Sequence, residues 1–62
     1  MPESPEMTIA LAAYNGVCLL GENGEAPLDV ATVTAPVELC GAVLFRLPLN
    51  GKEYVVRVQE LA

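Results

Sequence analysis

The sequence predicts an all-β fold, or a β fold with one short helical segment, built as a small antiparallel meander or an SH3-like or OB-like barrel of about five short strands. The first observation is that Asn-Gly, which suits the two-residue turns of β-hairpins, occurs three times in 62 residues. The second is that runs rich in β-branched and other apolar residues lie between these turns. Because a chain of this length has room for one domain, we expect a flexible tail over residues 1–6 and a single small β domain over 7–62.

The first pair of strands is predicted on either side of Asn15-Gly16. A two-residue loop there places Tyr14 opposite Val17, and both faces of the resulting pair are apolar, as in the centre of a sheet. Thr8, Ile9 and the apolar run after the turn favour strands over other structures.

The same stretch also fits a helix, and this alternative stays open. Ser4 would be the N-cap, Pro5 the first helical residue, and Glu6 would lie at the positive end of the helix dipole. Asn15 or Gly16 would end this helix. Its buried stripe would consist of Met7, Leu11 and Tyr14.

The middle of the chain predicts one further strand and a short turn. The strand covers about residues 28–34, between two prolines. Residues 34–41 fit a single helical turn, with Thr34 as its cap and Gly41 as its stop.

A hairpin is predicted around Asn50-Gly51. A two-residue turn there pairs Leu49 with Lys52, and the register then places the core-facing residues on one face. That face contains Val43, Phe45, Leu47, Tyr54, Val56 and Val58. The other face pairs Arg46 with Val55 and Leu44 with Arg57. Pro48 falls opposite Glu53 at a position where a strand tolerates proline.

The charge is strongly asymmetric along the chain. The net charge is −5 and the isoelectric point is near 4.2. Residues 1–45 contain six carboxylates and no Lys or Arg, whereas all three basic residues lie in 46–62. An acidic surface repels phosphate backbones, which argues against direct nucleic-acid binding, and it attracts basic protein surfaces. Glu22, Glu25 and Asp29 concentrate this charge around a glycine turn, without the ligand spacing of a calcium loop.

The residue types argue against catalysis. The sequence has no His, so it has no Ser-His or Cys-His pair, and two cysteines alone make a poor zinc site. Cys18 and Cys40 also lack a basic neighbour in sequence that would activate a thiolate. We expect no enzyme activity, no metal and no cofactor. The acidic start of the chain and the absence of a long apolar run lead us to expect a cytoplasmic protein without a membrane segment.

These observations lead to the hypothesis of a small protein-interaction module. It would act as an adaptor or an inhibitor that docks on a basic surface of a larger protein, and by analogy alone it would suit a viral or mobile-element inhibitor of a host protein. Glu22, Glu25 and Asp29 would steer the encounter, and Leu44, Arg46, Val55 and Arg57 would anchor the complex. The alternative is a structural subunit that forms a homodimer or a larger assembly. A 53% hydrophobic content and a mean hydropathy of +0.45 motivate it, because so small a surface hides little apolar area.

Overall fold

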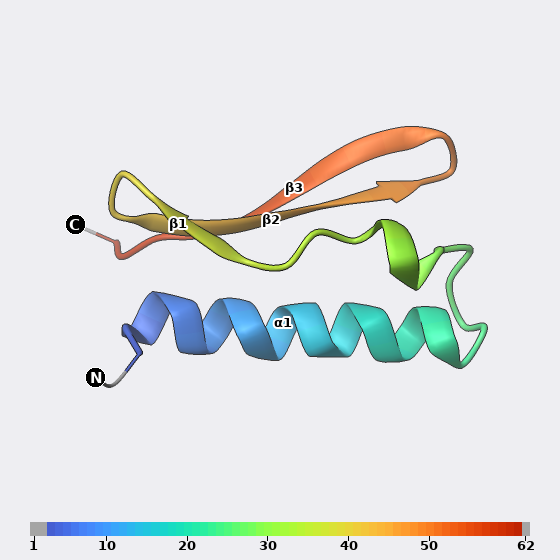
Figure 1. Cartoon of the computed structure of the whole chain (residues 1–62), viewed down its shortest axis with the longest axis horizontal. Helices are drawn as coiled ribbons and strands as arrows, with labels where there is room; N and C mark the ends of the chain where they lie inside the picture. The colour runs from blue at the N-terminus through green and yellow to red at the C-terminus, as the bar shows by residue number, and fades with distance from the viewer. Residues whose placement is uncertain (1–2, 62) are drawn as a thin grey trace.

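The computed structural model describes residues 3–61 and shows one α-helix beside a three-stranded antiparallel sheet (Figure 1). In chain order the elements are α1 (Pro5–Glu22), the 3₁₀ helix η1 (Val30–Thr32), β1 (Val37–Leu39), β2 (Ala42–Leu49) and β3 (Lys52–Val58). The sheet order is β1-β2-β3, and the sheet stays open rather than closing into a barrel. The predicted all-β fold of about five strands is therefore wrong, and the fold is mixed α/β.

The helical alternative for the first segment is the one that forms. The Ser4 side chain accepts a hydrogen bond from the Met7 backbone N–H at 3.1 Å, and Pro5 occupies the first turn. Glu6 also lies in this turn, close to the positive end of the helix. Pro5 and Glu6, which we expected in a flexible tail, are thus helical, and Met1 and Pro2 of that tail lie outside the described residues.

The dipeptide Asn15-Gly16 does not form the predicted hairpin turn. Both residues lie in the middle of α1 and are exposed. The helix continues to the next Asn-Gly pair, where Gly24 has a φ of +73°. There the Glu25 N–H donates to the Leu20 carbonyl at 2.9 Å, and the Gly24 N–H donates to the Gly21 carbonyl at 3.2 Å. These two bonds form a Schellman motif, so the second Asn-Gly pair ends a helix rather than joining two strands.

The hairpin around Asn50-Gly51 is confirmed in its full register. Leu49 pairs with Lys52, and β2 and β3 remain aligned out to Val43 opposite Val58. Asn50 and Gly51 have φ values of 55° and 76°, as the predicted turn requires. The alternation of apolar and polar residues in this hairpin is therefore sufficient to define its two faces.

The segment between the helix and the hairpin differs from its prediction. In place of a strand over 28–34, a single 3₁₀ turn forms, and Asp29 caps it by accepting a hydrogen bond from the Ala31 N–H at 3.1 Å. In place of a helical turn over 34–41, β1 pairs with β2, and a tight turn at Cys40-Gly41 joins them. Cys40 and Gly41 both have positive φ, 51° and 82°, so β1 and β2 form a second hairpin with a two-residue turn.

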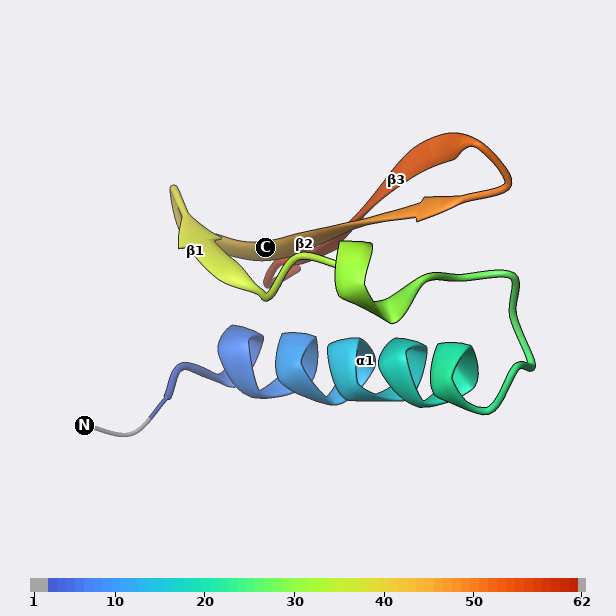
Figure 2. The same cartoon turned by 45° about the vertical axis from the view of Figure 1, so that its right-hand side comes forward.

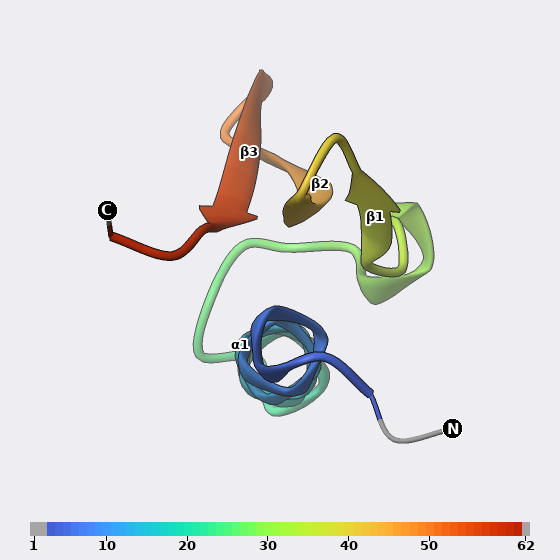
Figure 3. The same cartoon turned by 90° about the vertical axis from the view of Figure 1, so that its left-hand side faces the viewer.

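The core lies between α1 and the sheet face that contains Phe45. Phe45 and Val43 are each 1% exposed, and the Tyr14 ring meets the Phe45 ring edge to face with centroids 5.7 Å apart. Val17 of α1 and Val56 of β3 pack around this pair. Figures 2 and 3 show α1 beneath the sheet, with no described segment above it. The sheet therefore has one covered face and one outer face.

Candidate protein-interaction surfaces

The outer face of the sheet brings together the four residues predicted as anchors. In the register of β2 and β3, Arg46 lies opposite Val55 and Leu44 lies opposite Arg57, all on the face away from α1. Thr34 holds the backbone of Arg46 through two hydrogen bonds. The Arg46 N–H donates to the Thr34 hydroxyl at 2.8 Å, and the Thr34 N–H donates to the Arg46 carbonyl at 2.9 Å. Two apolar residues are thus interleaved with two cations on a surface that the hairpin holds rigid.

Two further apolar side chains extend this surface, and the sequence prediction missed both. Val37 of β1 lies opposite Leu44, and Leu39 lies opposite Ala42, so both share the outer face. Val37, Leu39 and Val55 are 52%, 59% and 58% exposed. The sequence signal for β1 was that apolar Val37 and Leu39 alternate with Glu38 just before Cys40-Gly41. We had assigned this stretch to a helical turn. We call the resulting surface the outer-face patch, and it consists of Val37, Leu39, Leu44, Arg46, Val55 and Arg57.

The acidic residues predicted to steer the encounter lie elsewhere. Glu22 ends α1, and Glu25 and Asp29 lie on the connection from α1 to η1. This connection lies at the same end of the molecule as the β2–β3 turn, beside the helix layer (Figure 1). Because the outer-face patch is on the opposite side of the sheet, one flat surface of a partner does not cover both. Among residues 3–61, no group of three or more His, Cys, Asp or Glu side chains is arranged to hold a metal ion.

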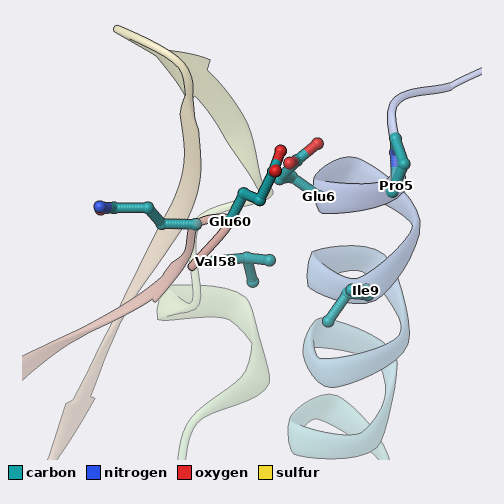
Figure 4. Close-up of a pocket in the computed structure, with 6 residues that line it drawn as sticks. Pro5, Glu6, Ile9, Val58 and Glu60 are labelled. Carbon is teal, nitrogen blue, oxygen red and sulfur yellow. The ribbon is translucent and has the colours of Figure 1, made fainter. Parts of the chain in front are cut away.

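A shallow pocket of about 300 Å³ lies between the first turn of α1 and the end of β3. Ile9 and Val58 supply its apolar walls, and Figure 4 shows the carboxylates of Glu6 and Glu60 on neighbouring sides of it. Pro5 and Gln59 complete the lining. The sequence prediction did not find this pocket, because it joins two segments from opposite ends of the chain.

Cys18, Cys40 and Tyr14 are the remaining side chains with reactive groups. Both cysteines are free thiols, with Cys18 half-buried on α1 and Cys40 exposed in the β1–β2 turn. The negative charge of a Cys18 thiolate, a hydrogen bond with Cys18 and partial burial raise the pKa of Tyr14 above its ordinary value. Tyr14 is therefore neutral at physiological pH and serves as an aromatic core residue against Phe45.

Comparisons with protein-family models, with curated proteins and with solved structures found no match for this chain. Within the described part of the chain, no helix combines the length and the apolar character needed to cross a bilayer.

Proposed function

We propose that this chain is a non-enzymatic protein-interaction module, an adaptor or an inhibitor, that docks on a larger protein through the outer-face patch. The observation that carries the proposal is the uncovered sheet face itself. It combines exposed Val37, Leu39 and Val55 with Arg46 and Arg57 on one rigid surface. Apolar residues interleaved with arginines are typical of the energetically important part of protein interfaces.

The exposed apolar side chains of this surface can supply part of the free energy of binding. Full burial of a Val or Leu side chain contributes about 1.5–3 kcal/mol, and these three are each about half exposed. Their complete burial therefore contributes roughly 1 kcal/mol apiece, before the arginines are counted. The guanidinium groups require a carboxylate or carbonyl on the partner opposite each of them.

The acidic residues raise the rate at which the protein meets its partner, and they do not contact the partner in the complex. The net charge of −5 and the cluster of Glu22, Glu25 and Asp29 favour approach to a protein whose wider surface is basic. Asp29 also caps η1, so its side chain has a structural role besides its charge. The partner we propose is thus basic overall, with an apolar contact area that offers acceptors to the two arginines.

We place this interaction in the cytoplasm. Cys18 and Cys40 lie on separate elements, so the fold does not depend on a disulfide and is compatible with a reducing compartment. One role that suits so small a binding module is that of an inhibitor which a virus or mobile element encodes and which binds a protein of the host.

The experiment that tests the proposal compares two aspartate variants of matched exposure. Leu39→Asp alters the outer-face patch, where Leu39 is 59% exposed, and Leu19→Asp alters α1, where Leu19 is 56% exposed. Tagged wild-type and variant proteins are used as bait in lysate from the source organism or its host, and bound proteins are quantified by mass spectrometry. A partner that Leu39→Asp loses and Leu19→Asp retains supports the proposal. Equal capture by both variants contradicts it.

A further inference from the structure

The free edge of β3 is a second surface with unused binding capacity. β3 pairs with β2 on one side, and no described segment pairs with its other side. In a hairpin with a two-residue turn, the pair next to the turn is hydrogen-bonded and such pairs then alternate along the strands. Lys52, which pairs with Leu49, therefore directs its backbone groups toward β2. By the same alternation Glu53, Val55 and Arg57 direct their N–H and C=O groups outward.

An antiparallel partner strand at this edge must use those three outward-facing residues. If the partner is a second β3, the geometry allows only registers in which outward-facing residues oppose one another. Centring the pair on Glu53 or on Arg57 places like charges directly opposite each other, which is destabilising. Centring it on Tyr54 or on Val56 places Val55 opposite Glu53 or Arg57, so no pair of opposite charges forms between outward-facing residues. Centring it on Val55 places Glu53 of each copy opposite Arg57 of the other and aligns all of Lys52–Val58.

We propose that two copies of this chain associate through β3, around a two-fold axis at Val55, to form a continuous six-stranded sheet. The occupant of the edge is a second copy because the strand is complementary to itself in charge. Two Glu53–Arg57 pairs flank a Val55–Val55 contact on the outer face. The outward groups of the three residues then form six backbone hydrogen bonds across the axis.

Apolar residues beside the edge support the same occupant. Ile9 borders the pocket that contains Val58, so this flank of α1 lies on the β3 side. Leu20 is about three helical turns further along the same flank. Ile9, Leu20 and Tyr54 are 57%, 45% and 49% exposed. A two-fold axis perpendicular to the sheet places both helices on one face, so these side chains of the two copies approach each other and lose exposure.

This inference goes beyond the proposed function, since it concerns the edge of β3 rather than a foreign partner on the outer-face patch. The two surfaces share Val55 and Arg57, whereas Glu53 belongs only to the edge pairing. A variant at Glu53 therefore tests self-association without altering the patch as defined above.

The test uses charge reversal and complementation, measured by sedimentation velocity and native mass spectrometry. Glu53→Arg makes both cross-axis pairs Arg–Arg, and Arg57→Glu makes both of them Glu–Glu. A mixture of the two variants restores an opposite charge at every pair, but only in the mixed dimer. Measurements at about 150 mM salt screen charges more than about 8 Å apart, so the net charge of −5 on each copy does not mask the result.

We expect the wild-type protein to form a species of twice the 6.5 kDa chain mass at about 100 µM. Each single variant should raise the dimer dissociation constant at least about tenfold, because two attractive pairs become repulsive. The equimolar mixture should recover the mixed dimer. A wild-type protein that stays monomeric, or a dimer that Glu53→Arg leaves intact and Leu39→Asp dissolves, would overturn the β3 edge pairing. A monomer whose β3 edge is instead occupied by a strand of another protein would do so as well.

Discussion

Replacing Gly16 with alanine should stabilise the protein, although Gly16 belongs to an Asn-Gly dipeptide. Gly16 lies in the middle of α1, and a Cβ atom built there meets nothing within 4 Å. An exposed glycine in the interior of a helix destabilises it by about 0.8–1.0 kcal/mol relative to alanine. The free energy of unfolding should therefore rise by about 1 kcal/mol, which raises the melting temperature of so small a domain by roughly 4–8 °C.

The same substitution has the opposite effect if residues 15 and 16 form a hairpin turn. A type I′ turn requires positive φ at both central residues, and alanine in that conformation costs roughly 1 kcal/mol or more. Denaturant titration and thermal unfolding, followed by circular dichroism, measure the change. A drop in stability for Gly16→Ala would refute the helix and restore the hairpin interpretation.

Two other glycines, Gly51 and Gly21, provide control substitutions. Gly51 has a φ of +76°, so Gly51→Ala should destabilise the β2–β3 turn by about 1 kcal/mol or more. At Gly21 a Cβ atom would lie 2.8 Å from Val30 Cγ2 and 3.2 Å from the Leu28 carbonyl oxygen. Moving the connection to η1 away from the helix costs about 1–3 kcal/mol and offsets the gain in helix propensity, so Gly21→Ala should leave the protein less stable than Gly16→Ala does.

Two further predictions concern the start of the helix and the acidic residues. Ser4→Ala removes the side-chain acceptor of the Met7 N–H and should lower the free energy of unfolding by about 1 kcal/mol in denaturant titration, while Ser4→Asp should retain it. The double variant Glu22→Lys and Glu25→Lys should slow association with the captured partner and flatten its salt dependence in surface plasmon resonance, with little change in the dissociation rate. Unchanged association rates at low salt would exclude a steering role for these two residues.

The hairpin could be predicted because its information is local. Asn50-Gly51 defines the turn, and the alternation around Phe45 is compatible with a single register, so the outer-face positions of Leu44, Arg46, Val55 and Arg57 follow directly. The residues that neighbour them on β1 were missed for a different reason. In a three-residue strand such as Val37–Leu39 the alternation around Glu38 occurs only once, which is too short to predict a strand. Its turn also uses Cys40 at positive φ, where glycine or asparagine is usual.

The helix could not be chosen from the first segment alone, because two local signals compete there. Asn15-Gly16 favours a turn, whereas the Ser4 cap and the Ala-rich stretch favour a helix. The contact between Tyr14 and Phe45 joins segments that are far apart in sequence, and burial of this kind decides between the two. The second Asn-Gly pair, Asn23-Gly24, predicted a turn between two strands, and the structure shows that it caps a helix instead.

The measurement that tests the central proposal most directly is methyl chemical-shift mapping of the complex with the captured partner. Methyl groups of Val37, Leu39, Leu44 and Val55 report on the outer-face patch, and those of Leu19 report on the far side of α1. Our account predicts that the outer-face methyls shift on binding while the Leu19 methyls do not. Shifts concentrated on α1, with the sheet methyls unchanged, would contradict it.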